Sequence, residues 1–276
     1  MKAVRYAVGG GEPRLGRLED DHVVDAGPAG FRGFDASPEA WEAVAAADGE
    51  QHALDAVRLL HPCEPQKIVA VGLNYQSHVE ETSLKRPDVP FAFAIWPNAL
   101  IGHDEEIVVP REETRPDWEG EVALILGRRV YRADRAAARA AIGGITAFND
   151  VSGRRAQLET PMKQFTLGKS FDTFAPMGPC VVHPDDLDLS RIDVRTTLNG
   201  EVVQESDTSQ LIFGFEELIE YFSKGVTLLP GDVIATGTPG GVGDERKPPR
   251  YLKEGDVIEV TVEGVGTLRN RVRREA

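Results

Sequence analysis

The sequence predicts an α+β protein built mainly from β-strands, in mixed and largely antiparallel sheets that curl into a sandwich or roll. Short apolar runs bounded by Gly, Pro, Asn and Asp dominate the chain after residue 66. Only two longer segments in that part have a helical pattern. Because strands do not alternate regularly with helices, a doubly wound parallel sheet is disfavoured.

A small α/β module is predicted over residues 1–62, ahead of a larger domain over residues 63–276. Within the module, residues 1–9 and 21–27 have strand character. Residues 38–60 have a helical pattern, with a break at Asp48-Gly49 left open. The Pro-containing segment 61–66 is interpreted as a linker.

The larger domain begins with a short buried strand over 67–72. Asn199-Gly200 is a typical hairpin turn between two strands. Helices are predicted over 133–144, which ends at a Gly pair, and over 214–225, which ends at Gly225. The remaining predicted strands are 105–110, 121–130, 144–150, 179–184, 193–204, 232–237 and 256–272.

Composition excludes several classes of protein. The formal net charge of −14 argues against nucleic-acid binding, which requires a basic face. Neither a membrane-spanning apolar stretch nor a secretory leader is recognised, so we expect a cytoplasmic protein without a membrane partner. Two distant cysteines, Cys63 and Cys180, exclude a disulfide framework and a Cys-rich zinc site. Complete P-loop, dinucleotide-binding, serine-hydrolase and zinc-protease motifs are absent.

Carboxylates are therefore the candidate chemical groups. In a strand, Glu119 and Glu121 would point to the same side as Ala123 and Ile125, which have a buried pattern. Asp150 ends another apolar run. Three such oxygen ligands suit a hard divalent cation, Mg²⁺ or Mn²⁺. A solvent-facing edge strand explains the Glu pair about equally well.

A second candidate cluster contains His78 and Glu81. Their spacing of three makes them neighbours on a helical turn, where a carboxylate can orient an imidazole as a general base. An exposed His on a polar turn is the commoner explanation. Lys169 is flanked by apolar and turn residues and could be partly buried, although a lysine that extends from a loop into solvent is more usual.

The order of the motifs is more specific than any one of them. The segments GLNYQSHVEE, PNALIGHDEEIVVP, DWEGEVALILG, FNDVSGRRAQ, GKSFDTFAPMGP, NGEVVQ, LLPGDVIATGTPGGVG and LKEGDVIEVTVEGVGTLRN occur in that sequence. Together they resemble the fumarylacetoacetate hydrolase superfamily over residues 67–272.

This resemblance implies a β-sandwich-roll catalytic domain, usually homodimeric, that acts on a small 2-oxo acid. It implies a metal site for Mg²⁺ or Mn²⁺. It also implies a catalytic His–Glu pair on a mobile lid segment and a catalytic lysine later in the chain. The implied metal ligands are Glu119, Glu121 and Asp150, the catalytic residues His78, Glu81 and Lys169, and the substrate-binding residues Asn74, Tyr75, Arg154, Gln157, Gly237 and Thr238.

Two positions depart from the family pattern. Ile95, followed by Trp96, stands where members often have a lysine, and Arg155 stands where they often have an acid. Both are expected near the substrate pocket. If the Ile95-Trp96 pair lines it, a less charged distal group on the substrate is favoured.

The main functional hypothesis is metal-dependent hydrolysis of a C–C bond in a 1,3-dicarbonyl 2-oxo acid such as an acylpyruvate, in the catabolism of aromatic or related compounds. The alternative is an oxaloacetate-type decarboxylase, or an isomerase or hydratase of 2-hydroxyhepta-2,4-diene-1,7-dioate. A non-catalytic binding module is a third reading, which the presence of both residue clusters disfavours.

Overall fold

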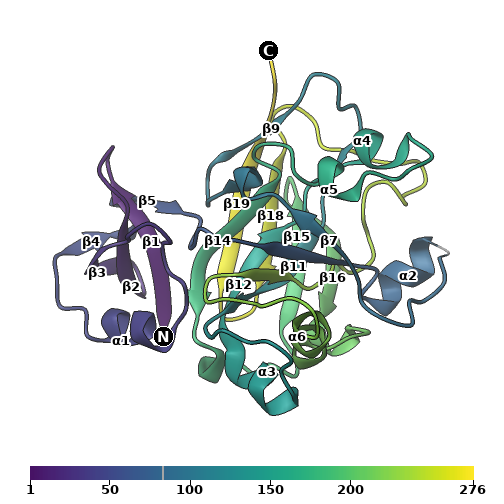
Figure 1. Cartoon of the computed structure of the whole chain (residues 1–276). Coiled ribbons are helices and arrows are strands. Elements are labelled where there is room, and N and C mark those ends of the chain that lie inside the picture. Colours follow the sequence, from purple (N-terminus) through teal and green to yellow (C-terminus); the bar gives the residue numbers. More distant parts are fainter. Residues whose placement is uncertain (83) are drawn as a thin grey trace.

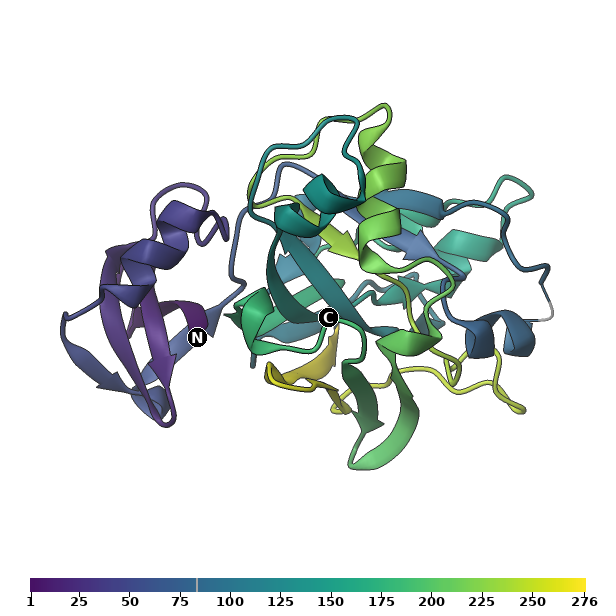
Figure 2. The same cartoon turned by 90° about the horizontal axis from the view of Figure 1, so that it is seen from below.

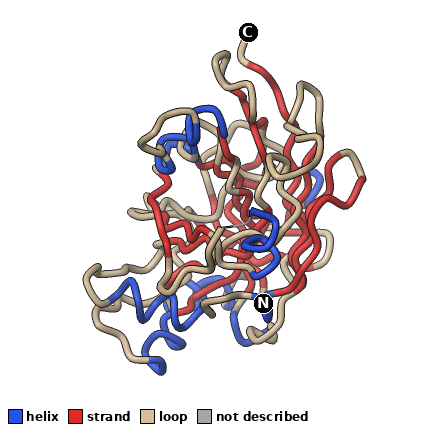
Figure 3. Tube along the Cα trace, turned by 90° about the vertical axis from the view of Figure 1, so that its right-hand side faces the viewer, coloured by secondary structure: helices blue, strands red, loops and turns tan. Residues whose placement is uncertain are grey.

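A computed structural model describes residues 1–82 and 84–276, and it confirms the mainly-β α+β class. Strands fill the middle of the molecule and helices lie at its periphery (Figure 3). The largest sheet follows the order β4 (Gln51–Ala53), β3 (His22–Pro28), β2 (Arg14–Glu19), β1 (Lys2–Val8), β14 (Ala175–Val182), β12 (Ile142–Asn149), β11 (Gly120–Leu126), β17 (Val233–Ala235), β6 (Ile68–Gly72) and β7 (Phe91–Ile95). Two further strands join it, β5 (Val57–Leu60) beside β1 and β8 (Leu100–Ile101) beside β14.

A second sheet packs across the first. Its order is β16 (Glu201–Asp207), β15 (Asp193–Leu198), β18 (Val257–Val262), β19 (Gly266–Arg274) and β9 (Glu106–Val109). The short strands β10 (Pro116–Asp117) and β13 (Ser152–Gly153) form a separate pair. The β15–β16 turn has positive φ at Asn199 and Gly200, as the predicted hairpin requires.

The helices are short and join the strands. They are α1 (Pro38–Ala45), α2 (Gln76–Thr82), α3 (Arg135–Ala141), α4 (Arg154–Leu158), α5 (Phe165–Gly168) and α6 (Phe215–Ser223), with 3₁₀ turns η1 (Leu54–Ala56), η2 (Pro97–Ala99), η3 (Pro184–Asp186) and η4 (Thr208–Gln210). In Figure 1, α3 and α6 lie together below the sheets, α4 and α5 lie together at the other end, and α2 lies at the side. In the described part of the chain, no helix has the length and apolar character that a membrane crossing requires.

Strand β11 has both faces buried. Val122, Leu124 and Leu126 pack in one apolar core with residues of the second sheet, and the alternate residues Ala123 and Ile125 pack in another core on the opposite face. Since β11 lies between β12 and β17, it is an interior strand. The edge-strand explanation of the Glu pair is therefore wrong.

The N-terminal residues form the purple unit at one side of the molecule (Figures 1 and 2). Strand β1 pairs with β14 through Lys2 and Ala3, so the unit extends the main sheet. The side chain of Trp41 is buried and its Nε1 donates a 2.7 Å hydrogen bond to the Gly143 carbonyl in the larger part. The division between residues 62 and 63 remains a prediction.

The predicted helix over 38–60 is wrong in its second half. Helix α1 ends at Ala45, and residues 57–60 form β5, which pairs antiparallel with β1. The apolar residues Leu59 and Leu60 are buried in this pairing. Helical periodicity in a short Ala-rich and Leu-rich segment could not reveal that a sheet strand would offer these side chains a better partner.

Asp25 on β3 is a polar anchor of this N-terminal unit. It accepts hydrogen bonds from the Tyr6 hydroxyl at 2.7 Å and from the Arg14 Nε at 2.7 Å. The Arg14 guanidinium, together with Tyr6, lowers the pKa of Asp25 to about 2 from an ordinary value of 3.8. This carboxylate therefore stabilises the fold above pH 3.8, and the contribution is lost as the pH falls through 2.

Replacing Asp25 by Asn is expected to lower the free energy of unfolding at pH 7 by roughly 1 to 2 kcal/mol. The difference from the wild type should shrink as the pH falls towards 3, because Asp25 in the unfolded chain, with its ordinary pKa of 3.8, then binds a proton while the folded state stays ionised. Urea unfolding of the wild type and the variant at pH 7 and at pH 3 measures this difference in the free energy of unfolding. A difference that stays constant with pH would contradict the assigned role of this ion pair.

Candidate active site

The antiparallel register of β11 and β12 brings the three predicted metal ligands together. Gly120 is paired with Asn149, so Glu119 and Glu121 at the start of β11 lie beside Asp150 at the end of β12. The Asp150 backbone N–H also donates to the Glu119 carbonyl at 2.9 Å. One carboxylate oxygen from each of the three lies within 4.8 Å of the others, and all three residues are buried.

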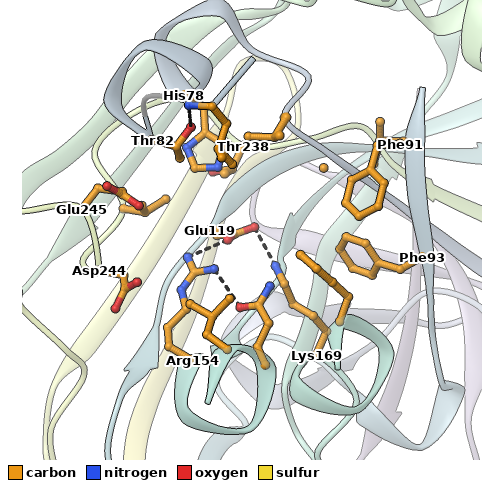
Figure 4. Close-up of a pocket in the computed structure, with 18 residues that line it drawn as sticks. His78, Thr82, Phe91, Phe93, Glu119, Arg154, Lys169, Thr238, Asp244 and Glu245 are labelled. Atoms are coloured by element: carbon orange, nitrogen blue, oxygen red, sulfur yellow. Dashed lines mark hydrogen bonds and ion pairs between the residues drawn. The ribbon is translucent and has the colours of Figure 1, made fainter. Parts of the chain in front are cut away.

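Two basic side chains contact these acids (Figure 4). The Lys169 Nζ lies 2.7 Å from Glu119 Oε2 and 2.8 Å from Asp150 Oδ2. The Arg154 Nη2 lies 2.7 Å from Glu119 Oε1 and 2.8 Å from Asp117 Oδ2. Lys169 is only 2% exposed, so it does not extend into solvent from its loop.

The charges of this cluster do not balance. The buried acids Asp117, Glu119, Glu121 and Asp150 carry four negative charges when ionised, against two positive charges on Arg154 and Lys169. Although burial opposes ionisation of Glu119, the adjacent Lys169 and Arg154 lower its pKa to about 2. Burial raises the pKa of Asp150 to about 6, and burial with the charges of Asp150 and Glu119 raises that of Glu121 well above its ordinary value.

The residues fit a divalent cation. Two uncompensated negative charges and three converging oxygens match the charge and the oxygen preference of Mg²⁺ or Mn²⁺. Asp150 Oδ1 is buried and has no hydrogen-bond partner among the described residues, which leaves a lone pair for such an ion. Glu121 Oε2 accepts a hydrogen bond from the Gly237 N–H at 2.8 Å.

His78 lies on α2, above Glu119 in Figure 4. Its Nδ1 is 2.8 Å from Glu81 Oε1, while Glu81 Oε2 accepts from the Gly241 N–H at 2.7 Å. Ser77 Oγ accepts from the Gly240 N–H at 3.0 Å. These two hydrogen bonds connect helix α2 to the loop at Gly240 and Gly241. His78 is 8% exposed and lines the cavity. The alternative of a solvent-exposed His is therefore wrong.

Three more predicted substrate-binding residues line the same cavity. The Gln157 side chain accepts a 3.0 Å hydrogen bond from Arg154 Nη1 through its Oε1. Thr238 Oγ1 donates to the Gly120 carbonyl at 3.0 Å and accepts from Gln204 Nε2 at 2.8 Å. Arg154 lines it as well. Their predicted contact with a substrate stays a prediction.

Asn74, Tyr75 and Gly237 support the site from behind the cavity lining. Asn74 is fully buried, with its Nδ2 donating to the carbonyls of Thr236 at 2.8 Å and Phe213 at 3.1 Å. Gly237 has φ +106°, and a Cβ there would lie 2.8 Å from the Asn74 Cβ. The buried Tyr75 hydroxyl has no hydrogen-bond partner, and burial followed by the charge of Glu121 raises its pKa.

The two departures from the family pattern do not line the cavity. Ile95 is 1% exposed and packs in an apolar core with residues such as Ala123 and Ile125. Arg155 is exposed on α4, where its Nε pairs with Glu159 Oε2 at 3.0 Å. Trp96 is 48% exposed and also lies outside the lining. The condition that the Ile95-Trp96 pair lines the pocket is therefore not met, and a place near the substrate stays a prediction for these residues.

Sequence reasoning missed Asp117. This buried carboxylate accepts two hydrogen bonds from Arg154, at 2.9 Å from Nε and 2.8 Å from Nη2, and two from the backbone N–H groups of Gly243 and Asp244. It therefore fixes both the guanidinium and the loop at the cavity wall. Its position two residues before Glu119, in the same alternation as the Glu pair, was the available signal.

Sequence reasoning also missed the other cavity walls. Phe91 and Phe93 line one side, and Asp244 and Glu245 line the opposite side (Figure 4). Phe165 also lines the cavity and packs against Phe91 and Phe93. Phe91 and Phe93 are two residues apart on β7, so their side chains point to the same side of the sheet. The cavity has a volume of about 150 Å³.

Comparison with known proteins identifies this arrangement. The family model described as the fumarylacetoacetate (FAA) hydrolase C-terminal domain matches residues 67–273. The chain belongs to the fumarylacetoacetate hydrolase family. It is therefore an enzyme of this family, and the resemblance of the ordered motifs is confirmed.

Relatives within the fumarylacetoacetate hydrolase family carry different activities in their names. The mitochondrial oxaloacetate tautomerase FAHD2A of Bos taurus is 42% identical over 209 residues, which cover 75% of this chain and 67% of that protein. A solved 5-carboxymethyl-2-hydroxymuconate delta-isomerase from Mycobacterium smegmatis is 36% identical, with TM-score 0.83 and full coverage of both chains. A fumarylacetoacetate hydrolase from Exiguobacterium antarcticum is 33% identical, with TM-score 0.86 and full coverage of both.

Proposed function

We propose that this enzyme moves a proton on a small 2-oxo acid, as an enol–keto tautomerase or double-bond isomerase, with Mg²⁺ or Mn²⁺ at the carboxylate cluster. The observation that carries the proposal is that His78, paired with Glu81, lines the same cavity as Glu119, whose carboxylate forms the buried cluster with Glu121 and Asp150. The names of the Bos taurus tautomerase and the Mycobacterium smegmatis isomerase support proton transfer over C–C hydrolysis.

The reaction changes no atom count. An enol loses the proton of its C2 hydroxyl and gains a proton at C3, and the reverse reaction removes the C3 proton. When bound, a divalent cation supplies Lewis acidity that polarises a 2-oxo group and favours loss of the neighbouring C–H proton. Glu119, Glu121 and Asp150 would hold it.

The protein's own groups carry out the proton transfer in this proposal. Glu81 engages His78 Nδ1, so the other ring nitrogen is available to exchange a proton with the substrate. Lys169 and Arg154 add positive charge at the cluster, where an anionic 2-oxo acid gains from it. Asp117 positions Arg154. A metal-dependent C–C hydrolase is the second candidate, favoured by the likeness to the Exiguobacterium enzyme.

The first test follows the near-ultraviolet absorbance of two enols, of oxaloacetate and of phenylpyruvate, after chelator treatment of the enzyme. We expect metal-free enzyme to leave the spontaneous decay almost unchanged, and added Mg²⁺ or Mn²⁺ to accelerate the loss of at least one enol. Malate dehydrogenase with NADH reports the keto product of the oxaloacetate enol. Metal-loaded enzyme that accelerates neither enol would contradict the proposed function.

We also propose that the enzyme is a homodimer, as the family resemblance implies. Light scattering during size-exclusion chromatography is expected to give about twice the 30.1 kDa chain mass. A mass equal to one chain across a range of concentrations would contradict it.

A further inference from the structure

Three phenylalanine rings form a continuous wall of the active-site cavity, here called the aromatic wall: Phe91 and Phe93 on β7, and Phe165 at the start of α5. The Phe165 ring centroid lies 5.2 Å from that of Phe91 and 5.6 Å from that of Phe93. Leu84 and Leu158 extend the apolar lining. Phe91 is 39% exposed, so part of this wall is open to a ligand that could cover it.

The aromatic wall begins beside the carboxylate cluster. The Lys169 Nζ lies 5.3 Å from the Phe93 ring centroid and also contacts Glu119 and Asp150. A substrate whose 2-oxo acid end binds at the cluster can therefore place its distal end against the three rings.

A second carboxylate on the substrate would find no unpaired basic side chain in the described lining of the cavity. Its basic side chains in the described lining, Arg154 and Lys169, are already paired with Asp117, Glu119 and Asp150. His78 is paired with Glu81. On the side opposite the aromatic wall, Asp244 and Glu245 would repel an anion (Figure 4). An unpaired carboxylate placed in such surroundings loses hydration without compensation.

We propose that the aromatic wall selects 2-oxo acids whose distal group is apolar, an aromatic ring or a branched alkyl group, over 2-oxo dicarboxylates. This proposal rests on the proposed function, because it assumes that a 2-oxo acid binds at the carboxylate cluster. Oxaloacetate, the compound in the name of one relative, carries such a distal carboxylate and is therefore expected to be disfavoured by this enzyme. Phe91, Phe93 and Phe165 are its specificity-determining residues.

The test uses oxamates, which resemble a 2-oxo acid but have a nitrogen in place of C3 and therefore no C–H proton next to the 2-oxo group. Binding of N-phenyloxamate and of N-(carboxymethyl)oxamate to Mg²⁺-loaded enzyme is measured by titration calorimetry, with unsubstituted oxamate as the reference. We expect the phenyl compound to bind at least about tenfold more tightly than the carboxymethyl compound. Since no turnover is involved, the result does not depend on whether enols are converted.

Variants of the aromatic wall test whether its rings cause the preference for N-phenyloxamate. Phe165→Ala and, separately, Phe91→Ala are expected to weaken N-phenyloxamate binding about tenfold, while oxamate binding changes less than about twofold. Phe31→Ala is the matched control, because this phenylalanine is 94% exposed and lies outside the cavity. Equal or tighter binding of the carboxymethyl compound would overturn the proposal. So would absence of phenyl-compound binding, or a preference that survives both cavity variants.

Discussion

The Glu121→Gln variant is expected to be more stable than the wild type without metal, and to lose stabilisation by Mg²⁺ or Mn²⁺. Glu121 is 1% exposed, and burial with the charges of Asp150 and Glu119 raises its pKa. A carboxyl with a raised pKa costs stability as the pH rises above its unfolded value, by about 1.4 kcal/mol for each unit of the rise. Gln removes that cost and can still accept the hydrogen bond from the Gly237 N–H.

The two effects have opposite signs, which makes the prediction sharp. Thermal unfolding of chelator-treated protein should show an advantage of Glu121→Gln that grows between pH 5 and pH 8. Calorimetric titration should show metal affinity reduced by about 10² or more, since losing a ligand costs at least as much as losing a group that orients one. Glu42→Gln, an exposed acid on α1, is the control. A destabilised metal-free variant with unchanged metal affinity would contradict the charge argument.

The His78→Ala variant is expected to lose proton transfer while it keeps ligand binding. Removal of a positioned general acid–base group lowers kcat by about 10² to 10⁴. Metal and oxamate affinities should change little, because His78 contacts Glu81 and lies outside the carboxylate triad. Stopped-flow decay of an enol together with calorimetry checks both parts.

Matched variants separate a chemical role of His78 from a structural one. Glu81→Gln is expected to give a smaller loss of kcat, because its amide can still contact His78 while the charge is gone. His22→Ala, in the N-terminal unit, should behave as the wild type. Activity of His78→Ala within about fivefold of the wild type would show that another group moves the proton.

The metal-ligand cluster could largely be predicted from the sequence, because it depends on the pattern of residues within single strands. Alternation in a strand places Glu119 and Glu121 on one side, and an acid that ends the next buried strand is a natural third member. Spacing alone could not reject the edge-strand alternative. The position of β11 between β12 and β17 does so, and that is a property of the whole sheet.

Other features depend on contacts between distant segments. Lys169 meets Glu119 across 50 positions of sequence, and Phe165 meets Phe91 across more than 70. The sequence pattern shows neither pair. Likewise, residues 57–60 have helical periodicity but become a strand because β1 provides an antiparallel partner. Ile95, at a family position of interest, shares one side of β7 with Phe93 but lies farther along the strand and is buried in the core, whereas Phe93 packs partly against that core and also lines the cavity.

The most direct test of proton transfer as the reaction is product analysis by NMR in D₂O with metal-loaded wild-type enzyme. The enols of oxaloacetate and phenylpyruvate and an acylpyruvate are supplied separately. We predict the keto form with one deuterium at C3, gained at the enzymatic rate and with all carbons retained. Rapid formation of pyruvate with a free carboxylic acid from the acylpyruvate, without prior deuteration at C3, would instead establish C–C hydrolysis and contradict the tautomerase proposal.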